Sequence, residues 1–117
     1  MPSPRRVEKL SNLIREQLAG FLEREIEFPD GVLVTVTRVT VSPDAHYAGA
    51  MISVLPEKKE KTAREILAKN ISRVQQAINR ALRTRPVPKI TFRIDAQEAR
   101  RERVEESLAQ LKQKKEL

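Results

Sequence analysis

Apolar residues recur at helical spacing in three segments of the chain, residues 4–27, 57–69 and 71–84. A recurrence of about 3.6 residues predicts helices that each bury one face. Ser3 followed by Pro4 is a typical N-cap and first-turn pair, so the first helix is expected to begin there. The apolar positions of this first helix are Val7, Leu10, Ile14, Leu18, Phe21, Leu22 and Ile26.

Three other segments are rich in β-branched residues and predict strands over residues 32–42, 46–55 and 89–95. In the first strand the alternation of apolar and polar positions changes phase near Thr37 and Arg38, which predicts a β-bulge. A short turn separates the first two strands, so they are expected to form a hairpin. The predicted order, α-β-β-α-α-β, is typical of an α+β fold whose three-stranded sheet carries helices on one face.

The length of 117 residues fits one domain with a single hydrophobic core. We expect residues 1–96 to form this domain. Residues 97–117 are highly charged and hold few apolar positions. They are therefore predicted to form a C-terminal tail that is helical or partly disordered.

The positive charge of the chain is concentrated in one window. The formal net charge is +7, and the window from Lys61 to Arg93 holds nine basic residues and one acid, Glu65. A charge gathered in this way predicts a surface that binds a polyanion such as nucleic acid. Aromatic residues make up only 3% of the chain, which argues against recognition of single strands by base stacking.

Residues 69–83, projected as a helix at 100° per residue, separate into an apolar face and a polar face. The polar stripe lies within about 40° of one line and is about 21 Å long, enough to meet several successive phosphates. The stripe consists of Lys69, Arg73, Gln76, Arg80 and Arg83. The basic surface is extended by Arg85, Lys89 and Arg93. A solvated helix face usually alternates Glu with Lys, whereas no acid occurs between Ile66 and Ile94, so polyanion binding is favoured.

The sequence offers no catalytic residue, metal-ligand cluster or cofactor motif. His46 is the only histidine and is interpreted as a surface residue, Asp44 as a turn residue and Asp95 as an isolated carboxylate. The absence of cysteine excludes disulfides and thiolate metal sites. No apolar run reaches the roughly 20 residues that span a bilayer, and no secretory signal is recognised. We expect a cytoplasmic, non-enzymatic protein with no small-molecule substrate and no membrane partner.

Over about residues 5–106 the chain resembles the bacterial ribosome-binding factor A family. Residues 36–44 (VTRVTVSPD) and 47–50 (YAGA) are similar to the strand–Ser–x–Asp–turn–strand pattern of that family. Residues 83–95 (RTRPVPKITFRID) resemble its Arg–x–Arg–x–Val–Pro–x–Leu–x–Phe–x–x–Asp pattern. Residues 6–8 (RVE) fit as well. Two motifs in order, in a chain of the right size, make the resemblance specific.

The resemblance implies a KH-like fold of type II. It also implies binding to the small (30S) ribosomal subunit and its 16S ribosomal RNA, with a role in late subunit maturation and in processing of the 5′ end of that RNA, without chemistry. KH domains usually clamp RNA with a GXXG loop between two helices, and this chain has none there. The family instead joins those helices by a kink, typically Ala–x–Gly, which is matched here by Asn70, Ile71 and Ser72.

Two other functions are compatible with the same residues. The chain could be a generic KH-like RNA-binding regulator, although the missing GXXG loop and the few aromatics count against this. It could also be a module whose basic face meets an acidic protein. No apolar patch in the sequence requires a dimer, so we expect a monomer.

Overall fold

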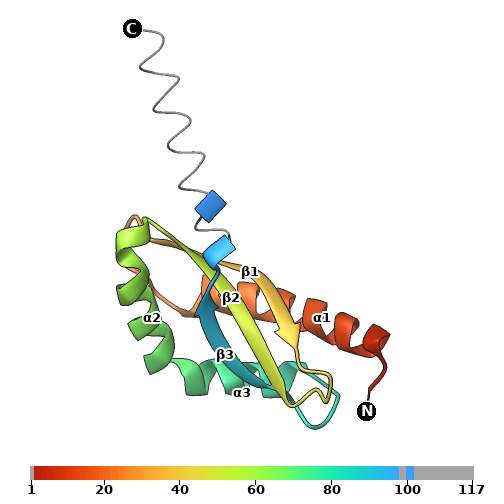
Figure 1. Ribbon diagram of the computed structural model, residues 1–117. Helices are drawn as coiled ribbons and strands as arrows, with labels where there is room; N and C mark the ends of the chain where they lie inside the picture. The colour runs from red at the N-terminus through yellow and green to blue at the C-terminus, as the bar shows by residue number, and fades with distance from the viewer. Residues whose placement is uncertain (1, 98–99, 102–117) are drawn as a thin grey trace, which may run out of the picture.

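The computed structural model describes residues 2–97 and 100–101 and contains the six predicted elements in the predicted order (Figure 1). A short 3₁₀ turn, η1, precedes the second helix. The elements are α1 (Pro4–Glu25), β1 (Leu33–Val41), β2 (Tyr47–Leu55), η1 (Glu57–Lys59), α2 (Glu60–Lys69), α3 (Ile71–Ala81) and β3 (Lys89–Ile94).

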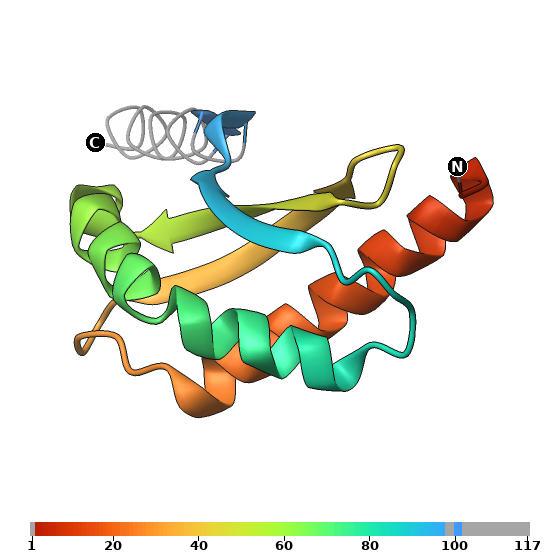
Figure 2. The same ribbon diagram turned by 90° about the horizontal axis from the view of Figure 1, so that it is seen from below.

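The three strands form one mixed sheet in the order β1-β2-β3. Strand β1 pairs with β2 in antiparallel fashion, as a hairpin must, and β3 pairs with β2 in parallel. Helices α1, α2 and α3 all lie against the same face of the sheet (Figures 1 and 2). The predicted α+β fold with the element order of the KH-like type II class is therefore confirmed.

The predicted β-bulge lies in β1, where the register with β2 shifts between Val36 and Arg38. Val36 pairs with Ile52 before the shift, and Val41 pairs with Ala48 after it. Because one extra residue is inserted, the valines on both sides of the bulge face the helices. The change of phase in the sequence is thus the residue pattern of a bulge.

The core is aliphatic and lies between the helices and the sheet. Ile14 and Leu18 of α1 are completely buried, as are Ile52 of β2 and Val74 of α3. Burial of one such side chain contributes about 1.5–3 kcal/mol, so this layer is the main source of stability. The buried apolar set is Ile14, Leu18, Leu22, Ile26, Val36, Val41, Ala48, Ala50, Ile52, Val54, Ala63, Leu67, Val74, Ile78, Leu82 and Ile90.

Helix α3 ends at Ala81, three residues earlier than predicted. Leu82 has extended backbone angles (φ −95°, ψ 139°) and its side chain is buried. An extended backbone at this point turns the Leu82 side chain into the core, which ends the helix. Arg83, predicted to be the last member of the helical stripe, therefore lies outside the helix.

Asp95, interpreted from sequence as isolated, instead links the two edge strands across β2. It is only 5% exposed. Its Oδ2 accepts a hydrogen bond from the Thr37 hydroxyl (2.6 Å) and lies 3.6 Å from Arg38 Nε, while its Oδ1 accepts from the backbone N–H of Gln97 (3.1 Å). The interpretation was wrong because Thr37 and Asp95 are 58 positions apart in sequence.

The hairpin turn lies where the sequence predicted it, and side chains close it. Asp44 Oδ1 accepts hydrogen bonds from the Ser42 hydroxyl (2.6 Å) and from the backbone N–H of His46 (3.0 Å). The hydrogen bond from Ser42, followed by that from His46, holds the pKa of Asp44 below its ordinary value of 3.8. Ala45 has a positive φ of 59°, which lets the chain reverse.

The predicted C-terminal tail lies almost entirely outside the described residues. Of residues 97–117 the structure describes only 97, 100 and 101. The domain boundary after residue 96 and the helical or disordered state of the tail therefore stay predictions.

Candidate nucleic-acid interface

The two consecutive helices α2 and α3 are interrupted at a single residue, Asn70. Its backbone N–H donates to the carbonyls of Ile66 (3.2 Å) and Leu67 (3.1 Å), and its side-chain amide donates to the Ile66 carbonyl (2.8 Å). A local side-chain hydrogen bond of this kind competes with continuation of the helix. The predicted kink of residues 70–72 thus narrows to Asn70, because Ile71 and Ser72 are already the first residues of α3.

The kink separates the first stripe residue from the rest. Lys69 is the last residue of α2 and is exposed, whereas Arg73 belongs to α3. The stripe is therefore not one continuous helical line. Only Arg73, Gln76 and Arg80 share the outer surface of a single helix, about 10 Å long at 1.5 Å per residue.

Arg73 is held by residues of the same chain. Its guanidinium donates to Asn70 Oδ1 (2.9 Å) and to the backbone carbonyl of Glu25 (3.4 Å), and it lies 3.8 Å from Glu25 Oε2. Its Cζ lies 5.9 Å from the centre of the Phe21 ring. Each contact is weak at a half-exposed site, but together they fix Arg73 between the kink and the end of α1.

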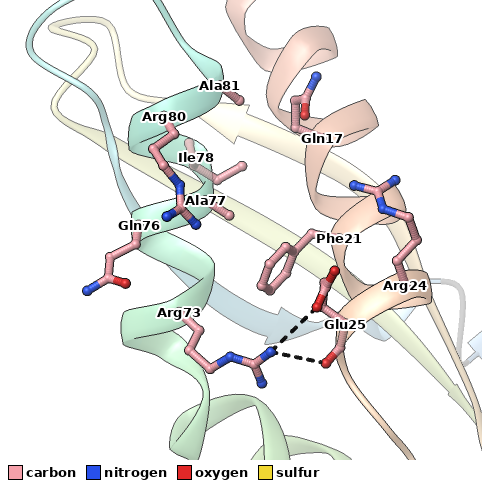
Figure 3. A pocket seen from close by; sticks show the side chains of 10 residues that line it. All are labelled: Gln17, Phe21, Arg24, Glu25, Arg73, Gln76, Ala77, Ile78, Arg80 and Ala81. Atoms are coloured by element: carbon pink, nitrogen blue, oxygen red, sulfur yellow. Dashed lines mark hydrogen bonds and ion pairs between the residues drawn. The ribbon is translucent and has the colours of Figure 1, made fainter.

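Arg80 differs, because its side chain makes no hydrogen bond or ion pair with any residue that the structure describes. It lines a groove of about 490 Å³ between α1 and α3 (Figure 3). Phe21 lies between the two helices, and Arg24 lines the α1 side. The groove is lined by Gln17, Phe21, Arg24, Glu25, Arg73, Gln76, Ala77, Ile78, Arg80 and Ala81.

Arg24 is the functional candidate that the sequence reasoning missed. It is exposed and makes no ion pair with a described residue. Its Nη1 lies 2.8 Å from the point that a Cβ of Gly20 would occupy, so the guanidinium rests on the backbone of α1 where Gly20 has no side chain. The only sequence signal for this arrangement was the spacing of Gly20 and Arg24, which lie four residues apart and therefore share one face of the helix.

Arg83 and Arg85 lie beyond the end of α3 and have different environments. Arg85 donates to the carbonyls of Leu82 (2.9 Å) and Asn79 (3.3 Å), so its charge stabilises the C-terminal end of α3. Arg83 is exposed and borders a second groove, between the N-terminal half of α1 and the loop before β3. The structure thus gives Arg85 a structural task and leaves Arg83 available to a partner.

Lys89 and Arg93 do not join the α3 surface. In β3 the alternate residues Ile90, Phe92 and Ile94 face the core, so Lys89 and Arg93 project from the other face of the sheet, opposite α1, α2 and α3. The sheet separates them from α3. The sequence placed them near the stripe because it gives their distance along the chain but not the layer in which they lie.

Among residues 2–97 and 100–101, no group of three or more His, Cys, Asp or Glu side chains is arranged to hold a metal ion. Within the same range, no helix is long and apolar enough to cross a membrane.

The fold and the basic groove define a class: small α+β proteins with KH-like topology and a cationic helical surface. The sequence model of the ribosome-binding factor A family matches residues 6–108. The chain belongs to the ribosome-binding factor A family.

Relatives and solved structures agree with this assignment. The chain is 31% identical to ribosome-binding factor A of Thermomicrobium roseum, covering 98% of this chain and 89% of the relative. It is 34% identical to the same factor of Gemmatimonas aurantiaca, covering 99% and 81%.

The crystal structure of ribosome-binding factor A from Thermus thermophilus matches with a TM-score of 0.66 and 25% identity, covering 75% of this chain and 93% of that one. A homology model of the Thermus thermophilus factor, fitted into a cryo-EM map of its complex with the 30S subunit, matches with a TM-score of 0.63 and 26% identity, covering 73% and 90%.

Proposed function

We propose that this protein is an assembly factor that binds the small (30S) ribosomal subunit through 16S ribosomal RNA. The single observation that carries the proposal is the groove between α1 and α3, where Arg24 and Arg80 have no acidic partner among the described residues. Membership of the ribosome-binding factor A family supports the choice of ribosome, as does the 30S complex of the Thermus thermophilus factor.

The groove fits a folded RNA backbone better than an isolated base. Guanidinium groups on both rims can each donate two hydrogen bonds to one phosphate, which gives geometric selection as well as attraction. Gln17 and Gln76 add neutral donors and acceptors for ribose or phosphate oxygens. Lys69 and Arg83 lie at the two ends of α3 and would contact neighbouring phosphates.

The kink has an indirect part in this proposal. Asn70 accepts a hydrogen bond from Arg73, and Arg73 in turn contacts the end of α1. Asn70, with Ile71 and Ser72 after it, therefore sets the direction in which α3 lies against α1. We propose that the kink fixes the width of the groove and leaves the RNA contacts to the arginines.

The protein would act by binding, without chemistry and as a monomer, in the cytoplasm where ribosomes are assembled. It would stabilise one conformation of 16S ribosomal RNA late in maturation, while the 5′ end of that RNA is processed, and then leave. No cofactor has a role in this scheme. The energy for any rRNA rearrangement comes from the difference in affinity for the two RNA conformations.

The test is binding of the full chain to purified 30S subunits, followed by crosslinking with the RNA positions read out. The double variant Arg24→Glu with Arg80→Glu should keep its fold and lose at least about 100-fold in affinity, because two charge-assisted contacts become repulsive. Arg5→Glu with Arg15→Glu is the matched control, since it makes the same two exchanges at exposed positions of α1 outside the groove. Equal affinity of the Arg24→Glu, Arg80→Glu variant and the control would remove the proposed site.

The same experiment separates the alternative functions. A generic RNA regulator would bind 50S subunits and free RNA as well as it binds 30S subunits. A module for an acidic protein would retain its partner after nuclease treatment. Crosslinks that spread evenly over 16S and 23S ribosomal RNA would contradict the ribosome-specific part of the proposal.

A further inference from the structure

The face of the sheet opposite α1, α2 and α3 brings together a second set of side chains that the groove does not use. Lys89 pairs in register with Tyr47, and Arg93 pairs with Met51. On the other side of β2, Arg38 pairs with the same Met51. Three cations from β1 and β3 thus surround the outward side chains of the central strand.

Tyr47 is the exposed aromatic ring of this face. Its exposed fraction is 60%, whereas Phe21, Phe28 and Phe92 are partly buried against the core. The low aromatic content of the sequence argued against base stacking, but composition does not reveal that the one tyrosine is exposed on the face of the sheet opposite the helices. A flat ring beside cations on a sheet is the arrangement that stacks with bases of single-stranded nucleic acid.

Gly49 lies between Tyr47 and Met51 in β2, and nothing within the described fold requires a glycine there. Its φ is not positive, and a Cβ added at this position would meet only the carbonyl oxygen of Thr40, at the ordinary contact distance of 3.9 Å. Glycine inside a strand weakens it. A glycine without a structural reason often marks a place where a ligand approaches the backbone closely.

The charges of the face favour a polyanion. Lys89 and Arg93 make no ion pair with a described residue. Arg38 lies 3.6 Å from Asp95, which is the carboxylate at the edge of the face and is almost completely buried. The other outward positions of the three strands are neutral: Leu33, Thr35, Thr40, Tyr47, Gly49, Met51, Ser53, Leu55 and Thr91.

We propose that this face of the sheet is a second RNA-binding surface, which takes a short single-stranded segment. The ring of Tyr47 stacks on one base, Gly49 lets the adjoining nucleotide lie against the sheet, and the cations hold phosphates at both ends. Tyr47 and Met51 are about 13 Å apart along the strand. The inference rests on the proposed function only for the choice of RNA as the partner. The surface itself is independent of the groove, because the two are on opposite sides of the sheet.

An extended peptide fits this face less well. β2 is the central strand, so its backbone groups already pair with β1 and β3 and cannot take up another strand. A peptide would have to bind through side chains alone. A flat face with a tyrosine, a glycine and surrounding cations fits stacked bases and phosphates more closely.

The experiment measures binding of the full chain to a fluorescently labelled, unstructured RNA of about eight nucleotides, within the range of lengths that a single-strand-binding surface covers, and separately to 30S subunits. Tyr47→Ala should weaken oligonucleotide binding about 5- to 150-fold, the range for loss of one stacked base, while Tyr47→Phe should retain it. The charge reversals Lys89→Glu with Arg93→Glu should abolish it. Arg24→Glu with Arg80→Glu should leave oligonucleotide binding unchanged and weaken subunit binding only.

Gly49→Val separates binding from folding. A β-branched residue suits a strand, so this variant should unfold at a higher temperature than the parent chain and yet bind the oligonucleotide at least about 5-fold more weakly, like a variant that loses one stacked base. A purely structural role of Gly49 would give the opposite result, with lower stability and unchanged binding.

Wild-type oligonucleotide affinity in both the Tyr47→Ala and the Lys89→Glu, Arg93→Glu variants would overturn the inference and leave the groove untouched. Competition by poly-glutamate as strong as that by RNA would also overturn it, because the face would then recognise charge alone. The proposed function is tested separately, by the loss of 30S binding in the Arg24→Glu, Arg80→Glu variant.

Discussion

Arg73 and Arg80 are two turns apart on the same face of α3, yet their surroundings differ. Arg73 contacts Asn70, Glu25 and the ring of Phe21, whereas Arg80 contacts no polar partner among the described residues. The sequence treats them as equivalent members of one stripe. The difference predicts that Arg80 is available to RNA and that Arg73 is not, because an acid from elsewhere in the chain reaches Arg73. Here the acid, Glu25, is 48 positions away.

The largest expected effect follows from removing the packing that supports both arginines. Ile78 is 1% exposed and lies between them on the inner face of α3. Ile78→Ala leaves a cavity and should lower the free energy of unfolding by about 2–5 kcal/mol. Urea denaturation measures this value. A loss below roughly 0.5 kcal/mol, the low end for removal of a single buried methyl group, would mean that α3 is not anchored as described.

Charge reversal at the available arginine should have the next largest effect. Arg80→Glu removes a charge-assisted contact and adds repulsion, so affinity for 30S subunits should fall about 10- to 100-fold with no loss of thermal stability. Titration of labelled protein with subunits measures it. Arg15→Glu alone serves as the control here, and an equal loss in both variants would show a general charge effect.

Arg73, which is held by contacts within the chain, should show the reverse pattern, with a loss of stability and a small change in affinity. Arg73→Ala loses its contacts with Asn70 and Glu25, so the free energy of unfolding should fall by about 0.5–1.5 kcal/mol. Subunit affinity should change less than for Arg80→Ala. Denaturation and titration of the same preparations give both values, and a larger loss of affinity than of stability would place Arg73 in the RNA contact.

Glu25→Gln should make the surroundings of Arg73 resemble those of Arg80. The change removes the carboxylate that lies 3.8 Å from Arg73 but keeps its backbone carbonyl. Arg73 should then be able to contact a phosphate, and affinity for 30S subunits should rise about 2- to 5-fold at low salt. Unchanged or reduced affinity would show that Glu25 is not the group that limits Arg73.

The smallest expected effect concerns pH. Asp44 in the hairpin has a pKa held below 3.8 by hydrogen bonds from Ser42 and His46, so its stabilising contribution is fully present above pH 3.8. It is lost as the pH falls through the lowered pKa of the folded state. Asp44→Asn should remove this part of the acid-induced loss of stability and leave subunit binding at neutral pH unchanged. Thermal melts across this pH range, with a subunit titration at neutral pH, check both.

The sequence was sufficient for the fold because apolar periodicity is a local property. The shift of phase near Thr37 predicted the bulge, since the valines on both sides must reach one core. The helix end at Leu82 could not be predicted, because it depends on a core space that only the assembled sheet and α1 create.

The site was predicted less completely. Arg80 and Gln76 lie where helical spacing placed them, but the partner of Arg73, the α1 side of the groove and the layer of Lys89 and Arg93 depend on tertiary contacts. A helical projection shows how residues are arranged around one helix, but not which other elements pack against it. For the same reason Asp95 was taken as isolated, although its partner Thr37 is in another strand.

The most direct test of the account is the salt dependence of 30S binding for Arg80→Ala and Arg73→Ala, measured side by side. A lysine or arginine that meets a phosphate contributes about one unit to the slope of log K against log salt. The account predicts that Arg80→Ala lowers the slope by about one unit and that Arg73→Ala leaves it unchanged. Equal slopes for the two variants would contradict the distinction between a bound and an available arginine.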